Sequence, residues 1–173
     1  SSYDDFSKNF RIKVPEGVNF AWDVVDRVAS REPGRRALTW CDDRGGEAEF
    51  TFGQLAEQST RAASFFRGIG ITRGDPVMLV LKRRYEFWFC LLGLHKLGAV
   101  AIPATHLLTK KDFVYRNNAA SVKAVVCVDD PKVLDTVDAS MAESPTLKHR
   151  IALGGGRGAP GASTRPGWRD FTT

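Results

Sequence analysis

The stretch that decides the fold is PVMLVLKRRYEFWFCLLGLHKLGAVAIP, residues 76–103. Residues 77–81 and 99–103 are short apolar runs of strand length, and 85–97 between them has helical length and nine apolar positions of thirteen. Gly98 follows this helix pattern as a C-terminal cap. Such an alternation of strand and helix is typical of parallel strands joined by crossover helices.

The same alternation continues to residue 153. Thr109 is a good N-cap three residues before Asp112, whose carboxylate complements the positive end of a helix. Asp130-Pro131 is a second helix start, because proline suits the first helical position after an N-cap. The pattern predicts a helix over 110–119, a strand over 123–128, a helix over 131–142 and a strand over 149–153.

The first 75 residues have a different organisation. The turn-forming residues 42–46 separate two strand patterns and indicate a hairpin. Thr51 and Gln54 have the spacing of a capping box at the start of a helix. The predicted elements are an amphipathic turn over 3–10, a helix from Asn19 to Glu32, strands over 37–41 and 47–52, and a helix from Thr51 to Gly70.

The fold class expected from these patterns is α/β, a parallel-rich sheet flanked by helices with an N-terminal hairpin. Residues 154–167 contain six glycines and two prolines in 14 positions, a composition too flexible to pack as an element. The predicted parts are the helices and hairpin of 1–75, the alternating β/α unit of 76–153, the flexible loop 154–167 and the start of a next segment at 168–173.

Composition places the chain of 173 residues among globular proteins, with 43% hydrophobic and 26% charged residues. The net charge of +5 favours anionic partners, but no basic stripe with interleaved aromatic residues predicts nucleic-acid binding. Three scattered cysteines without a Cys-x-x-Cys pair predict neither disulfides nor zinc, and a cytoplasmic location is expected. The most apolar run, 87–94, is too short to span a membrane.

Two loops follow predicted strands and precede helices, where parallel sheets bind ligands. The first contains Lys82, Arg83 and Arg84, three cations that could receive a phosphate at a helix start. The alternative is that they only solvate the rim of a very apolar helix. The second loop is 104–109, which is either a binding loop or an ordinary connection.

Two further patterns favour a structural interpretation. The run Gly154 to Gly158 resembles a phosphate cradle but lacks the Lys-Ser/Thr ending, so it is interpreted as a linker. The pair Asp129-Asp130 could bind a cation, but the proline that follows favours helix capping. No metal-ligand spacing and no catalytic residue is predicted in this sequence.

The order of several short motifs resembles the amino-terminal part of the AMP-forming acyl-CoA synthetases, and most closely their medium-chain and acetyl-CoA-synthetase-like branch. The resemblance covers essentially the whole chain. Its motifs are Tyr3-Asp4-Asp5-Phe6, Val14-Pro15-Glu16, Asn19-Phe20-Ala21, Trp40, Thr51-Phe52, Leu97-Gly98-Ala99-Val100 with Pro103, Asp112-x-x-Tyr115-Arg116 and Gly167-Trp168-Arg169-Asp170-Phe171.

The resemblance implies a parent enzyme about three times longer that uses ATP, magnesium and coenzyme A to convert a carboxylate into an acyl-CoA. The family's phosphate loop, its adenine and metal motif and its C-terminal lysine are not in this sequence. The chain is therefore expected to be inactive alone, with the rest of the synthetase as its partner. The resemblance implies coenzyme A contacts for the loop of His106, Leu107 and Leu108, with His106 as the polar contact.

Other functions stay open at this point. One is a free-standing α/β binding or interaction module without catalysis, and another is a nucleotide-binding α/β regulator. For a truncated subdomain, we also expect the helix of Trp88 to leave apolar surface exposed and to cause homodimers or aggregates.

Overall fold

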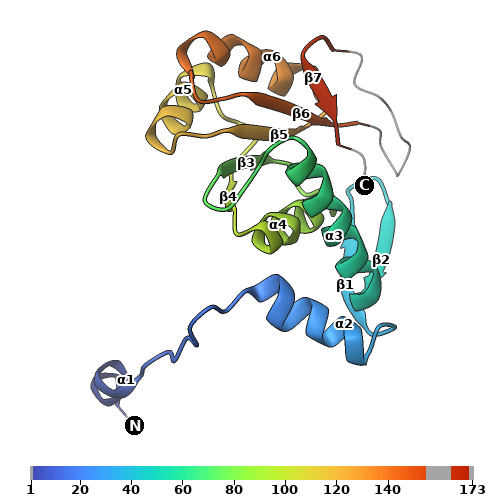
Figure 1. The fold of residues 1–173 in the computed structure, drawn as a ribbon, viewed down its shortest axis with the longest axis vertical. Coiled ribbons are helices and arrows are strands. Elements are labelled where there is room, and N and C mark those ends of the chain that lie inside the picture. The colour runs from blue at the N-terminus through green and yellow to red at the C-terminus, as the bar shows by residue number, and fades with distance from the viewer. Residues whose placement is uncertain (1, 155–164, 172–173) are drawn as a thin grey trace.

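The computed structural model describes residues 2–154 and 165–171, and its centre is a five-stranded sheet (Figure 1). Every strand pair in this sheet is parallel, and the spatial order is β4-β3-β5-β6-β7. The predicted α/β fold is confirmed. The strands are β3 (Pro76–Val80), β4 (Val100–Pro103), β5 (Ala124–Val128), β6 (His149–Leu153) and β7 (Trp168–Asp170).

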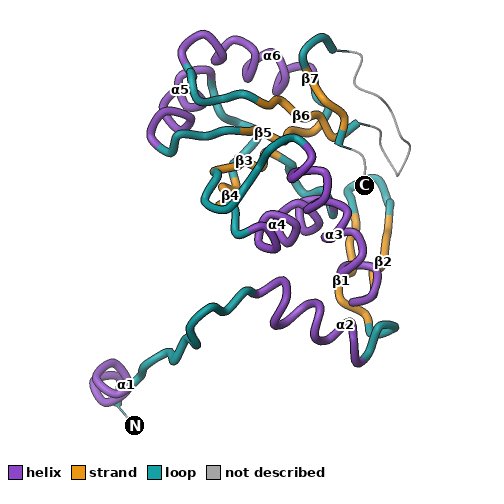
Figure 2. Tube along the Cα trace, in the orientation of Figure 1, coloured by secondary structure: helices purple, strands orange, loops and turns teal. Residues whose placement is uncertain are grey.

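Helices cover both faces of the sheet, as Figure 2 shows. One layer contains α3 (Phe52–Gly68) and α4 (Glu86–Leu97), and the other contains α5 (Lys110–Ala119) and α6 (Pro131–Ser140). All five residues of β5 are buried between these layers. The core is therefore the sheet with the inner faces of four helices, as a doubly covered parallel sheet requires.

Capping explains where the predicted helices begin and end. Thr51 and Gln54 form the predicted capping box of α3, and Thr109 and Asp112 form one for α5. Gly98 ends α4 with a φ of 68°, the left-handed conformation that glycine adopts without steric cost. The helix expected over 131–142 ends earlier, since α6 stops at Ser140 and a 3₁₀ turn, η2 (Met141–Glu143), follows.

Strand β7 is an element that the sequence patterns miss. Its three residues pair with β6, with Arg169 opposite Ile151. Only Trp168 of the three is buried, so no apolar run marks this strand in the sequence. Most of the loop predicted over 154–167, including the glycine run to Gly158, lies outside the described residues.

The hairpin predicted before the sheet is confirmed as β1 (Arg36–Cys41) and β2 (Glu47–Thr51), which pair antiparallel. The Asp42 carboxylate accepts hydrogen bonds from the backbone N–H groups of Arg44 and Gly46 and thereby closes the turn. Aromatic rings attach the hairpin to α4, because Trp40 and Phe50 both contact Tyr85 at centroid distances of 5.2 and 4.9 Å.

The chain before the hairpin differs from the single helix expected after Asn19. It forms a π-helix, η1 (Ala21–Asp26), which continues directly into α2 (Arg27–Arg31). The side chain of Asn19 accepts hydrogen bonds from the N–H groups of Ala21 and Trp22, so its predicted capping role is confirmed. A seven-residue helix, α1 (Tyr3–Asn9), lies at the end of an extended segment (Figure 1).

Candidate functional site

The carboxyl edge of the sheet is the candidate site. After β3 the chain crosses to β4 on one side, whereas β5 lies on the other side of β3 and leads on to β6. The loops after β3 and β5 therefore diverge at a topological switch point, the place where open parallel sheets bind ligands. The predicted anion residues Lys82, Arg83 and Arg84 lie in the loop after β3.

Lys82 is joined to the neighbouring loop by an ion pair. Its Nζ lies 2.8 Å from Oδ2 of Asp130, which follows β5. The hydrogen bond from Lys82 lowers the pKa of the Asp130 carboxyl, against the smaller effect of burial. The other Asp130 oxygen accepts from the N–H of Lys132, so the predicted capping of α6 is confirmed.

Arg84 is also paired with a carboxylate. Its Nε donates to Oε2 of Glu86 at 3.0 Å, and the Glu86 side chain is buried at the start of α4. Hydrogen bonding to Glu86 raises the pKa of Arg84 despite the opposing effect of burial. Burial, followed by the charge of Glu86, raises the pKa of the intervening Tyr85. Arg84 therefore has a structural role at the start of α4, where it is paired with Glu86.

Arg83 is different from the two cations beside it. Its backbone carbonyl accepts a hydrogen bond from Nε1 of Trp40 in β1, which fixes the loop to the hairpin. Its side chain is exposed and has no ion-pair partner among residues 2–154 and 165–171. Of the predicted trio, Arg83 is thus the cation that faces solvent without a carboxylate partner in the described chain.

The second candidate loop, 104–109, follows β4 at the same edge of the sheet. His106 is exposed, and Leu107 has 75% of its surface exposed. At the end of the loop the Asp112 carboxylate accepts from the N–H and hydroxyl of Thr109 at 2.9 and 2.7 Å. The hydrogen bonds from Thr109 lower the pKa of Asp112. The fold therefore anchors this loop at α5 and leaves its two central side chains accessible.

The described residues contain no group of three or more His, Cys, Asp or Glu side chains placed to hold a metal ion. The three cysteines are free thiols: Cys41 is exposed, and Cys90 and Cys127 are buried. Within the same ranges, no helix combines the length and the apolar character needed to cross a membrane.

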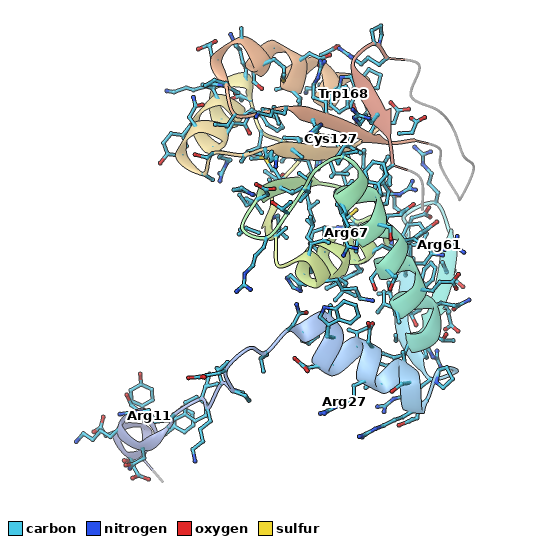
Figure 3. The ribbon with its side chains drawn as sticks, in the orientation of Figure 1. Arg11, Arg27, Arg61, Arg67, Cys127 and Trp168 are labelled. Carbon is cyan, nitrogen blue, oxygen red and sulfur yellow. The ribbon has the colours of Figure 1, made fainter. Side chains whose placement is uncertain are left out.

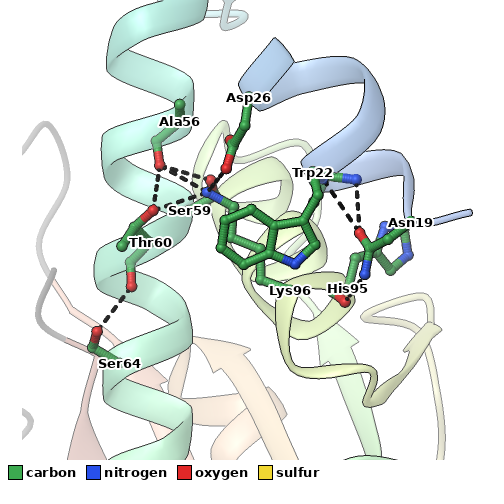
Figure 4. Close-up of polar contacts among 10 residues, drawn as sticks. Asn19, Trp22, Asp26, Ala56, Ser59, Thr60, Ser64, His95 and Lys96 are labelled. Carbon is green, nitrogen blue, oxygen red and sulfur yellow. Dashed lines mark hydrogen bonds and ion pairs between the residues drawn. The ribbon is translucent and has the colours of Figure 1, made fainter. Parts of the chain in front are cut away.

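A buried polar cluster, shown in Figure 4, is the feature that the sequence analysis misses. The side chain of Lys96 is only 2% exposed, and its Nζ lies 2.9 Å from Oδ2 of Asp26. It also donates to the Ala56 carbonyl at 3.1 Å and to the Thr60 hydroxyl at 2.8 Å. A lysine in the last turn of a helix is usually a solvated complement to the helix dipole, so no sequence signal marks its burial.

Comparison with known proteins assigns the family. The sequence model of the AMP-binding enzymes matches residues 25–165, which include both candidate loops. The chain belongs to the AMP-binding enzyme family. Its resemblance to the amino-terminal part of acyl-CoA synthetases is thereby confirmed. Solved CoA ligases share its fold.

Curated relatives of this AMP-binding family member are mitochondrial acyl-CoA synthetases. The chain is 37% identical over 164 residues to acyl-coenzyme A synthetase ACSM5 of Rattus norvegicus and 35% identical over 164 residues to that of Homo sapiens. Each match covers 91% of this chain and 27% of the relative, so the chain spans about a quarter of their length. The expected cytoplasmic location is wrong by this comparison, because these relatives are mitochondrial.

Solved structures with the same fold are CoA ligases. A benzoate CoA ligase from Burkholderia xenovorans is 27% identical, with a TM-score of 0.66 over 79% of this chain and 26% of that one. An acetoacetyl-CoA synthetase from Streptomyces lividans has a TM-score of 0.76 over 88% of this chain and 24% of that one. At 23% sequence identity, this match shows similarity of fold only.

Proposed function

We propose that this chain is the N-terminal part of an AMP-forming acid–CoA ligase. The reaction joins a carboxylate to coenzyme A with ATP and releases AMP and pyrophosphate. The observation that carries this proposal is the family match over residues 25–165 together with synthetase relatives at 37% and 35% identity. The relatives' mitochondrial names support a mitochondrial location for this protein.

We further propose that these 173 residues are inactive alone. Adenylation brings triphosphate and magnesium to a carboxylate and needs groups that stabilise charge on the reacting phosphorus. In the described chain, Lys82 and Arg84 are already paired with Asp130 and Glu86. This pairing supports a scaffold role.

The exposed loop 104–109 is the proposed contact with coenzyme A. His106 would supply a polar contact, and Leu107 would contribute through its backbone and its shape. Their exposure beside the switch point supports this role. Arg83 is the proposed anion-facing cation of the same edge, because its two neighbours are neutralised by carboxylates.

A chimaera tests the proposal. Residues 1–173 replace the matching segment of the rat ACSM5 synthetase, and acyl-CoA formation is measured with a series of carboxylates. We expect acyl-CoA from the chimaera and no pyrophosphate release from the 173-residue chain alone. Turnover by the chain alone contradicts the scaffold role. A chimaera that melts cooperatively but forms no acyl-CoA contradicts the ligase assignment.

The same chimaera tests the loop. We expect His106→Ala to raise the KM for coenzyme A several-fold and to leave the KM for ATP unchanged. Lys111→Ala, an exposed substitution on α5, is the matched control. An unchanged KM for coenzyme A would contradict the proposed contact between His106 and coenzyme A.

A further inference from the structure

The N-terminal arm, residues 3–24, carries most of the large hydrophobic side chains that are exposed in the described chain. Nine of the thirteen large exposed hydrophobic side chains belong to it, and four lie elsewhere. Helix α1 at its tip buries none of its residues, and Figure 1 shows it reaching away from the sheet. The nine are Tyr3, Phe6, Phe10, Ile12, Val14, Val18, Phe20, Trp22 and Val24.

The arm lacks the means to stabilise itself in water. Helix α1 has seven residues, and isolated helices shorter than roughly 12 to 15 residues are marginal even in favourable sequences. Ser2 caps the helix and Asn9 hydrogen-bonds to Asp5, but its one ring contact is the stack of Phe6 on Phe10, at 4.8 Å, and both rings remain more than half exposed. Large apolar side chains that are exposed together in one segment indicate a contact with another protein surface.

The base of the arm, at Asn19 and Trp22, contacts α4, as Figure 4 shows. Nδ2 of Asn19 donates to the His95 carbonyl at 2.6 Å. Nζ of Lys96 lies 4.8 Å from the centre of the Trp22 ring and also pairs with Asp26. Contacts with α4 thus fix the point at which the arm leaves the rest of the fold.

The composition of the arm indicates a protein partner. It contains Asp4, Asp5, Glu16 and Asp23 against Lys8, Arg11 and Lys13, a net charge of 3 − 4 = −1. An arm without excess positive charge is not suited to an anionic surface. Its 22 residues fall within the roughly 20 to 30 residues that one side of a stable protein interface supplies.

The relatives indicate which protein surface this is. A match to the Mus musculus ACSM5 synthetase covers 93% of this chain, so the remaining 7%, about 12 residues, is shorter than the arm. The relative therefore carries part of the arm, together with the 73% of its own length that lies outside the match. We propose that the N-terminal arm docks onto the part of the synthetase that follows this segment. This choice of partner rests on the proposed function.

Trypsin is the direct probe, because Lys8, Arg11 and Lys13 place three cleavage sites in the arm. We expect rapid cleavage there in the 173-residue chain and cleavage at least tenfold slower in the rat ACSM5 chimaera. Replacing Phe6 and Phe10 by serine should restore rapid cleavage in the chimaera. Tyr115→Ser, at a residue 71% exposed on α5, is the matched control and should leave the protection intact.

Two results would overturn the docking proposal. One is equal cleavage rates in the chain and in a chimaera that melts cooperatively. The other is protection in the isolated chain that rises with its concentration, which would assign the arm to a second copy. The readout needs no catalysis, so a protected but inactive chimaera keeps the docking proposal and rejects the ligase function.

Discussion

Nζ of Lys82 lies 2.8 Å from Oδ2 of Asp130, although 48 residues separate them in the sequence. The pair spans the switch point between β3 and β5, where the two loops diverge. Lys82 has a φ of 52°, a left-handed backbone that is unusual for a residue with a side chain. The lysine that a sequence would assign to an anion site thus ties two strand ends together.

We expect Lys82→Met to lower the free energy of unfolding at pH 7 by about 0.2 to 1 kcal/mol, because both partners are about one-third exposed. The pKa of Asp130 is lowered in the folded state, so the contribution is full above the ordinary value of roughly 3.9. The stabilising contribution of the ion pair is lost as pH falls through the pKa of Asp130 in the folded protein. Urea unfolding at pH 7 and pH 3 checks this. An equal loss of unfolding free energy at pH 7 and pH 3 would contradict this prediction. Lys111→Met is the control.

Gly93 allows α4 to approach α3. A Cβ at this position would lie 2.8 Å from Cβ of Ala62 and 2.9 Å from the backbone nitrogen of Ala63. We expect Gly93→Ala to destabilise the protein by about 1 to 3 kcal/mol, the usual cost of overpacking. Gly68→Ala, where a Cβ meets nothing within 4 Å, should instead stabilise α3 slightly. Thermal unfolding compares the two, and equal effects would argue against close packing at Gly93.

The Lys96 cluster should be a large contributor to the stability of the N-terminal helices. Asp26→Ala leaves a buried ammonium without its carboxylate, and we expect a cost of about 3 to 5 kcal/mol. Lys96→Met removes the buried charge itself and should cost less. Lys110→Met, which breaks an ion pair with more than half of each side chain exposed, should change stability by less than about 1 kcal/mol. Guanidinium unfolding of the three variants tests this order.

His149, at the start of β6, should make stability depend on pH. Burial lowers its pKa, and the charges of Arg169, Lys123 and Lys148 lower it further. A histidine whose pKa is lower in the folded than in the unfolded protein gives full stability above its unfolded pKa of roughly 6.5. This stability is lost as pH falls through the folded pKa. We expect stability to fall between pH 7 and pH 5. His149→Gln should flatten this slope in urea unfolding, and an unchanged slope would remove His149 as its source.

The thiols should differ in reactivity. Cys41 is exposed, whereas burial raises the pKa of Cys90 and that of Cys127, which keeps both thiols protonated. We expect a thiol reagent at neutral pH to modify Cys41 alone in the folded protein and all three after unfolding. Cys41→Ser should abolish the fast reaction, and rapid modification that persists in this variant would contradict the burial.

Local patterns determined most of the secondary structure. Strand runs, capping boxes and the glycine after α4 act between residues a few positions apart, so the sequence contains their full cause. The parallel sheet followed from the same alternation. The positions of the candidate loops could also be predicted, because the end of a strand depends on residues close together in the sequence. Strand β7 escaped prediction because only one of its three residues is buried.

The state of the candidate site was decided by tertiary structure. Whether Lys82 is available to an anion depends on Asp130, and that contact exists only because β3 and β5 lie side by side. The burial of Lys96 depends on η1 packing over α4, and nothing within four residues of Lys96 encodes it. The sequence by itself determined which elements form. The packing of those elements fixed which charges are neutralised, since burial and pairing depend on groups far apart along the chain.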